Sequence, residues 1–542
     1  MAASWMQSPF DHEFDILVEN ELKKWKVPGL SISVVHGPNT YSKVRKTTTV
    51  ENQALISVKA YGVAEVHSES DPTTDQPPTQ RMMSTNTLFP TCSTTKAFTG
   101  AATSIVIQDS KSTVSPISWN TPLASLIPED FSLEDASTTQ IITLEDALSH
   151  RSGMPEHGWT LAFMPKNDIT IQDTVRTMKH FPLASAPRTK YNYSNHMYIA
   201  VSHALEKHTG QPLGEIMKKR IWEPLGMHET FFSTKDAKAD TSTTHSFAQG
   251  HDWVSNEEGG VFVPLPNNDW QVNSGAGAIV SNVSDYALWI RELIERKRPL
   301  EGHGSLIEPR TFHFQNDDLN IPAPYHAYAL GWFVDHYRGH NFYSHPGGWP
   351  GFGSWVGFIP EKQFGFAIMG NSFSARYAAF RLGTYLLDKQ LGMPYDAVHE
   401  GQINDCIARH STEWHARLEK KTVEEAKREL YGTLLEPPIP HALPLPKYAG
   451  KYKHPSNISL TLKEHSESLK ADLHDRVIPC ELSVVHASGE FFVGTIHNRV
   501  QNLMPPFAVE FHIDVSGAVI KVGLLLEHAL EGKKIWFERC EE

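Results

Sequence analysis

The chain has 542 residues, which is too long for one ordinary core and favours two or more domains. A composition of 40% hydrophobic and 20% charged residues is typical of a soluble globular protein. The formal net charge of -13 and the scattered basic residues argue against a nucleic-acid partner.

The sequence indicates neither a secreted nor a membrane protein. The N-terminal stretch has acids among its apolar residues and lacks the uninterrupted apolar core of a secretory signal. No stretch approaches the roughly 20 apolar residues that span a bilayer. The four cysteines, Cys92, Cys406, Cys480 and Cys540, are widely separated and suggest neither a zinc ribbon nor a disulfide framework. We therefore expect a cytoplasmic protein with no membrane partner.

The predicted elements begin with a short amphipathic helix at 14–25. Two β-branched runs follow, at 27–36 and 54–66, bounded by Pro, Gly or Asn as strands commonly are. From Cys92 to about Glu295 the pattern becomes helical, with polar or glycine stops after most segments.

Strand-like runs return between 328 and 371, and a long helix at 374–392 closes the region. Because strands lie at both ends and helices lie between them, we predict an α+β fold. It would have one antiparallel sheet flanked by helices, with an inserted helical subdomain. A cleft between the sheet and this insertion is the expected ligand site.

The composition changes again toward the C-terminus. A charged helical stretch at 412–432 and a proline-rich segment at 436–446 predict a stiff linker. From Tyr448 onward, short alternating runs predict a small all-β barrel. The predicted domains are 1–400, a linker at 401–446, and 447–542.

The segment TCSTTKAFT contains the first candidate site residues, Ser93 and Lys96. If a helix begins near Cys92, their side chains lie on one face about one turn apart. A serine is a poor nucleophile unless a base takes its proton, and a lysine can do so only when neutral, a form that burial favours. The N–H groups at the helix start would also face an oxyanion. Alone, the pattern is weak and more often marks a solvated first turn capped by serine.

A second motif is Tyr193-Ser194-Asn195, at the start of a helical run. A tyrosine held near a lysine can act as a base, and an asparagine can orient the lysine and a substrate carbonyl. In isolation, the same residues are typical of a tyrosine-rich turn that caps a helix.

A third motif, His345-Pro346-Gly347-Gly348, lies at the end of a strand. Glycines there let a substrate approach the backbone, and the Gly348 N–H is a candidate oxyanion donor. Trp349, which follows, is a candidate for shaping an apolar acyl pocket, with core packing as the alternative. If the motif stood alone, a glycine-rich hairpin turn would be the favoured explanation.

Together the three motifs resemble the serine β-lactamase and penicillin-binding-protein superfamily, particularly its class C-like branch of esterases, D-peptidases and acyltransferases. The likeness includes segments such as LEDALSHRSGMP and HPGGWPGFGSW, and extends over roughly residues 12–392. The C-terminal module looks like the lipocalin-like barrel of some members. The resemblance implies acylation of Ser93, proton transfer by Lys96 and Tyr193, acyl binding by Asn195, and an oxyanion hole from the N–H groups of Ser93 and Gly348.

The third motif departs from the family pattern. In penicillin-recognising relatives, the positions of His345 and Pro346 supply a cation and a hydroxyl that bind a substrate carboxylate. Proline has neither hydroxyl nor N–H, and histidine is mostly neutral at pH 7. We therefore expect neutral ester, lactone or thioester substrates. The proline also predicts that this strand is an edge strand.

The 29 histidines form no H-E-x-x-H motif or comparable metal spacing, so no metal and no cofactor are assigned. We interpret His150, His157, His196 and His251 as surface or cleft-edge residues. The nucleophile-elbow motif G-x-S-x-G is absent.

The leading prediction is a serine hydrolase or acyltransferase with a Ser93 acyl-enzyme, acting on a small-molecule acyl substrate. Two alternatives stay open: a β-lactamase or D-amino-acid amidase or peptidase, and a non-catalytic scaffold that keeps the fold. A homo-oligomer is a further open alternative, as is the choice between transfer and hydrolysis.

Overall fold

The computed structural model describes residues 8–37, 55–66, 80–166, 169–240, 246–255, 259–266, 271–297, 299–313, 319, 321–323, 325–394, 396–418, 422–498 and 503–540. The chain divides into two units. The sheet unit comprises 1–121, 143–149 and 201–410, and the barrel unit comprises 122–142, 150–200 and 411–542. Each unit is described by itself.

Within the described residues, the sheet unit contains a nine-stranded antiparallel sheet. Its order is β3 (Arg81–Met82), β2 (Leu55–Glu65), β1 (Gly29–His36), β13 (Phe364–Gly370), β12 (Phe352–Ile359), β11 (His340–Trp349), β10 (Phe333–Tyr337), β9 (His326–Tyr328) and β8 (Thr311–His313). β1 pairs with β13, with Ile32 opposite Ile368. The two ends of the domain therefore share one sheet, which confirms the predicted fold class.

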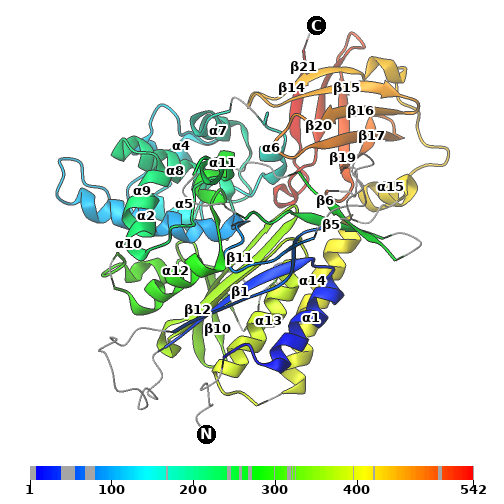
Figure 1. The fold of residues 1–542 in the computed structure, drawn as a ribbon. Helices are drawn as coiled ribbons and strands as arrows, with labels where there is room; N and C mark the ends of the chain where they lie inside the picture. Colours follow the sequence, from blue (N-terminus) through cyan, green and yellow to red (C-terminus); the bar gives the residue numbers. More distant parts are fainter. Residues whose placement is uncertain are drawn as a thin grey trace, which may run out of the picture. The chain divides into compact units, whose positions relative to one another are not determined.

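Helices cover both faces of this sheet. Helices α1 (His12–Trp25) and α13 (Ala375–Gln390) lie side by side on one face (Figure 1), where they share a core with Phe366. Helix α12 (Val283–Glu295) covers the other face. Gly365 precedes Phe366 in β13 and so faces this opposite side, where an added Cβ would collide with Ile290 of α12. Every residue of β1, β12 and β13 is accordingly buried.

The predicted helical region between β3 and β8 is present. It contains the short 3-10 turn η1 (Cys92–Thr94), then α2 (Thr95–Ser110), α5 (Leu144–Leu148), α8 (Asn195–Thr209), α9 (Leu213–Met217), the π-helical η3 (Lys218–Trp222), α10 (Glu223–Leu225), α11 (Thr234–Ala239) and the turns η4 (Gln271–Ala276) and η5 (Gly304–Ile307). Two small strand pairs accompany them: β4 (Phe89–Pro90) with β7 (Val280–Ser281), and β5 (His251–Val254) with β6 (Val261–Pro264). Helix α8 begins in the barrel unit and ends in the sheet unit.

Strand β11 corrects the prediction drawn from Pro346. It lies between β12 and β10, so the expectation of an edge strand is wrong. In the described residues, however, β10 pairs only with 340–344 of β11, while 345–349 pair with β12 alone. Pro346 therefore lies where β11 extends beyond the end of β10. A missing N–H is tolerated there, because no β10 residue pairs with this position.

The C-terminal module is a closed antiparallel barrel, which confirms the predicted all-β barrel. Its strands are β14 (Gly450–Lys453), β15 (Ser459–His465), β16 (Ser468–Leu473), β17 (Cys480–Ser488), β18 (Phe491–His497), β19 (Phe507–Ile513), β20 (Val519–Leu524) and β21 (Ile535–Arg539). β14 pairs with β21 and closes the barrel. Burial alternates along β16 and β17, because one set of side chains fills the interior.

The rest of the barrel unit is helical. It contains α3 (Leu123–Leu126), α4 (Ala136–Ile141), α6 (Gly158–Ala162), α7 (Ile171–Thr177), the turn η2 (Met178–His180) and α15 (Val423–Tyr431). Helix α14 (Ala397–Leu418) precedes α15. The proline-rich segment is bonded to the barrel, since the Gly489 N–H donates to the Ile439 carbonyl at 2.7 Å. Across the described residues, no helix combines the length and apolarity needed to cross a membrane.

Candidate active site

Ser93 stands out at the start of α2. From Thr91 through Ile107, every side chain is buried except that of Ser93, which is partly exposed. Cys92 has φ 53°, a left-handed conformation that non-glycine residues rarely adopt. One accessible hydroxyl at the N-terminus of a buried helix suits a nucleophile, because the helix dipole there favours negative charge.

Lys96 is fully buried beneath Ser93. Its Nζ lies 3.3 Å from Ser93 Oγ and donates to the carbonyl of Ala276 at 2.8 Å. The Ala276 segment is itself fixed, since Thr99 donates to the Gly275 carbonyl at 2.7 Å. A Cβ on Gly275 would lie 2.5 Å from Thr99 Oγ1, so only glycine fits there. The sequence offered no sign that a backbone carbonyl would orient the lysine.

The third motif packs against the turn that carries Ser93. A Cβ on Gly347 would lie 2.8 Å from the carbonyl oxygen of Thr91 and 3.2 Å from Cys92 Cβ. The strand can approach this closely only because residue 347 is glycine. Trp349, also partly exposed, lies over Gly277, where an added Cβ would be 3.2 Å from its indole ring.

His345 has its ring in the interior. It is 1% exposed; its Nδ1 donates to the Pro346 carbonyl at 2.6 Å, and its Nε2 accepts from Tyr328 Oη at 2.9 Å. Burial is the main cause that lowers the pKa of His345 to about 3, and Lys96 in its protonated form lowers it further. The imidazole is therefore neutral at pH 7 and supplies no cation to a substrate carboxylate.

Tyr193 and Asn195 lie together in the barrel unit, at the loop that leads into α8. Tyr193 is partly exposed, whereas Asn195 is buried and donates from Nδ2 to Glu156 Oε1 at 3.4 Å. The structure thus brings the predicted site residues together in two sets. Ser93, Lys96 and the third motif form the set in the sheet unit, and Tyr193 with Asn195 forms the other.

His150 fixes the loop around Tyr193. Its carbonyl accepts from the Asn192 N–H at 2.8 Å, and its ring Nδ1 accepts from the Ser194 N–H at 3.0 Å. The ring also packs on Tyr193, with centroids 4.4 Å apart. Because Nδ1 accepts, the proton of the neutral ring is on Nε2. Sequence reasoning missed this role, and the only signal was the position of His150 within the LEDALSHRSGMP segment.

Two substitutions of His150 should separate the contribution of its Nδ1 hydrogen bond from that of a side chain that only fills the space. His150→Gln should lower the free energy of unfolding by about 1–3 kcal/mol, because the Ser194 N–H stays buried without its acceptor. His150→Asn should cost less, since an asparagine oxygen can replace Nδ1 and asparagine tolerates the observed φ of 57°. Urea unfolding of both variants measures the difference. Equal destabilisation would contradict a role for the Nδ1 acceptor.

The other histidines also correct the sequence interpretation. His150, His157, His196 and His251 are all buried, so their assignment as surface or cleft-edge residues is wrong. Burial, followed by the charge of His157, lowers the pKa of His196 to about 3. Neutral imidazoles can be buried at low cost when a ring nitrogen donates to a carbonyl, as His196 Nδ1 does to that of Glu156.

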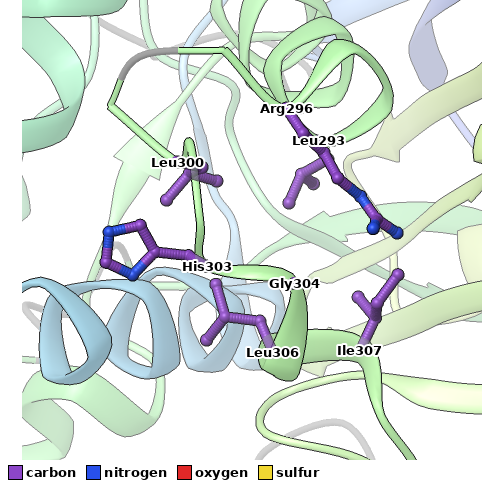
Figure 2. Close-up of a pocket in the computed structure, with 7 residues that line it drawn as sticks. All are labelled: Leu293, Arg296, Leu300, His303, Gly304, Leu306 and Ile307. Atoms are coloured by element: carbon purple, nitrogen blue, oxygen red, sulfur yellow. The ribbon is translucent and has the colours of Figure 1, made fainter.

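A small pocket in the sheet unit is separate from these residues (Figure 2). Its side chains come from α12, from the segment after it and from the turn η5: Leu293, Arg296, Leu300, His303, Leu306 and Ile307. The interior has no more room than one water molecule needs. None of the predicted site residues lines it, and it is too small for an acyl substrate.

Comparison with known proteins places the chain in a family. The Beta-lactamase family model matches residues 14–388, and a family described as a domain of unknown function (DUF3471) matches residues 435–539. An unguisins hydrolase of Aspergillus campestris is 34% identical over 543 residues, covering 98% of this chain and 92% of the relative. A second unguisins hydrolase, from Aspergillus violaceofuscus, is 31% identical and covers 98% and 91%.

A solved structure supports the same fold. The octameric penicillin-binding protein homologue from Pyrococcus abyssi superposes with a TM-score of 0.54 at 19% identity, over 97% of this chain and 99% of that one. Since the family model covers more than half of the chain and two relatives match nearly its full length, the chain belongs to the beta-lactamase family.

Proposed function

We propose that this protein is a serine hydrolase that works through an acyl-enzyme on Ser93. The observation that carries the proposal is the pairing of the partly exposed Ser93 Oγ with the fully buried Lys96 Nζ at 3.3 Å. A lysine accepts a proton only as the neutral amine, and desolvation favours that form. The relatives named hydrolases support hydrolysis rather than transfer to another acceptor.

Two half-reactions would follow. Ser93 Oγ bonds to the substrate carbonyl carbon while its proton passes to Lys96 or Tyr193. The tetrahedral oxyanion accepts from the N–H groups of Ser93 and Gly348, near the positive end of α2. The intermediate collapses to the acyl-enzyme, and the leaving group takes the proton. Water then attacks the ester carbon, gives its proton to the same base, and Ser93 leaves with that proton as the acid is released.

The substrate we propose is a neutral acyl compound such as an ester, lactone or thioester. The neutral, buried ring of His345 and the missing hydroxyl at Pro346 remove the groups that bind a carboxylate, which disfavours a β-lactamase. A second candidate is hydrolysis of an unguisin, favoured by 34% identity over 98% of the chain to a relative named for that activity. A non-catalytic scaffold is disfavoured by the intact pairing of Ser93 with Lys96.

Labelling with a fluorophosphonate tests the nucleophile. The wild type and the surface control Ser125→Ala should react and turn over p-nitrophenyl esters or an unguisin, because both keep the Ser93 hydroxyl. Ser93→Ala should do neither. Mass spectrometry of the labelled peptide locates the adduct. Equal labelling of wild type and Ser93→Ala would reject the acyl-enzyme and favour the scaffold.

A further inference from the structure

Within the barrel unit, the C-terminal barrel is bonded to the helical segment that carries Tyr193 and Asn195. The Lys166 N–H donates to the Asp475 carbonyl and the Val477 N–H to the Met164 carbonyl, both at 3.0 Å. These bonds join the β16–β17 turn to the segment after α6, much as strands are joined in a ladder. The barrel is therefore an integral part of this unit.

Aromatic contacts reinforce this junction. Phe181 is buried among three histidines from different segments: His454 from the barrel, His157 from the turn before α6, and His196 from α8. The rings of Phe181 and His454 are stacked, with centroids 5.5 Å apart and planes at 5°. The centroids of His157 and His196 lie 5.1 and 5.5 Å from that of Phe181. This aromatic cluster thus joins residues of the barrel, of the turn before α6 and of the start of α8.

A carboxylate of the barrel holds the turn before α6. Glu527 Oε2 accepts from the His157 N–H at 2.8 Å, while its Oε1 accepts from the Ala529 N–H at 3.1 Å. His157 has φ 46°, a left-handed conformation that a non-glycine residue needs contacts to maintain. A charge-assisted bond to its N–H is such a contact.

The other side of the same turn holds the start of α8. Glu156, adjacent to His157, accepts from Asn195 Nδ2 at 3.4 Å, and its carbonyl accepts from His196 Nδ1 at 3.3 Å. A displacement of the turn would therefore move the carboxylate that Asn195 contacts. Glu527 and Asn195 are linked through two adjacent residues.

We propose that the C-terminal barrel is a positioning element for Asn195, acting through Glu527 and the Glu156–His157 turn, and so sets selectivity for the acyl part of the substrate. The inference rests on the proposed function in one respect, the binding of the acyl side by Asn195. It gives the matched domain of unknown function a role inside the hydrolase. Glu527 is a positioning residue, because it acts through the turn and not on the substrate.

Hydrogen exchange of the full-length protein tests the positioning without using activity. Glu527→Ser keeps a preferred cap for the Ala529 N–H but is too short to reach His157. Exchange at 156–158 and 195–198 should rise about tenfold, as expected for losing one charge-assisted hydrogen bond. The control Glu531→Ser, at an exposed residue two positions after Ala529, should leave this exchange unchanged. Unchanged exchange at 195–198 in Glu527→Ser would overturn the proposal.

Glu156→Ala approaches the same link from outside the barrel and provides a second variant if Glu527→Ser folds poorly. It should raise exchange at 195–198 and leave exchange at 519–530 unchanged. If the amides at 519–530 lose protection as well, the variant unfolds generally, and the link is overturned.

Kinetics then test the consequence for selectivity. Glu527→Ser should change the ratio of kcat/KM between two acyl chains by about tenfold. The ratio between two leaving groups on one acyl chain should stay unchanged. The double variant with Glu156→Ala should be no worse than the poorer single variant, because both break one linkage. Equal effects on both ratios would overturn the selectivity role. If wild type and Ser93→Ala show equal turnover while exchange responds as expected, the proposed function fails and the positioning of Asn195 stands.

Discussion

Lys96→Arg is expected to reduce kcat/KM by about 10²–10⁴-fold, the usual contribution of a positioned general base. The lysine Nζ lies 3.3 Å from Ser93 Oγ in a fully buried position. A guanidinium keeps the positive charge but cannot lose its proton at any accessible pH, so it cannot take the proton of Ser93. Initial rates of ester hydrolysis between pH 6 and 10 measure the effect, and retained activity would remove Lys96 from the mechanism.

Size and charge need separate controls at this position. Lys96→Met removes the amine while keeping a long, unbranched side chain, so it should lose as much activity as Lys96→Arg. If only the arginine variant is impaired, crowding in the buried site is the cause, and the base is another group. Lys111→Arg makes the same exchange at an exposed residue just after α2 and should have no effect. Circular dichroism and thermal unfolding show whether each variant is folded.

The order of strands and helices along the chain was enough to predict the sheet. Strands β1 and β13 are buried on both faces. The run at 364–370 is accordingly apolar throughout, and the run at 27–36 places only small serines, Ser31 and Ser33, among its apolar residues before His36. Burial of a whole strand leaves a signature in local composition, and helices between two strand groups leave few ways to form one sheet. The C-terminal barrel was predictable for a similar reason, since its strands alternate and turns separate them.

The partners of the site residues were not predictable in this way. The carbonyl of Ala276 orients Lys96 from 180 positions away, and a backbone group has no identity in the sequence. His150 and Glu156 act through atoms that meet the Tyr193 loop only after folding. The prediction from Pro346 failed because it assumed that neighbouring strands are equally long.

Histidines illustrate a further gap. A histidine is as compatible with the surface as with the interior, and its environment is decided by long-range packing. His196 and His454 became interior residues because Phe181 and the barrel cover them. Both histidines lie in the barrel unit, and their burial makes the stability of that unit depend on pH.

Acidification from pH 7.5 to 5 is expected to destabilise the barrel unit more than the sheet unit. Burial is the main cause that lowers the pKa of His196 to about 3 and that of His454 to about 4. Unfolded imidazoles titrate near 6.5, so the unfolded state binds protons that the folded state refuses. The stabilisation is complete above pH 6.5 and is lost as the pH falls toward these folded values. At pH 5 each imidazole costs about 2 kcal/mol.

The sheet unit contains opposing groups. Burial lowers the pKa of His345 to about 3, and it also lowers those of His36, His251 and His303. Against these, burial raises the pKa values of Asp252 and Asp285 to about 6 and that of Glu292 to about 7. These carboxyls bind protons in the folded state before the unfolded chain does, which favours folding as the pH falls. In the barrel unit, by contrast, a hydrogen bond from Lys470 lowers the pKa of Glu481 from its ordinary 4.5, and this stabilisation is lost mainly below pH 4.5, so it does not oppose the effect of the histidines above pH 5.

Removing one titrating group from the barrel isolates the effect from these opposing contributions. His454 Nδ1 accepts from the Ser456 N–H at 3.2 Å, a bond that an asparagine oxygen can replace. His454→Asn should therefore reduce the pH dependence of barrel stability by about 1 kcal/mol per pH unit between pH 6 and 5, because one fewer proton is taken up on unfolding. Protection factors of barrel amides, corrected for intrinsic exchange, measure this slope. His465→Asn, at an exposed position of the same barrel, should leave it unchanged. An unaltered slope in His454→Asn would mean that this histidine takes up no proton when the barrel opens, and the acid sensitivity would then have to arise from other buried histidines of the unit, such as His196 and His157.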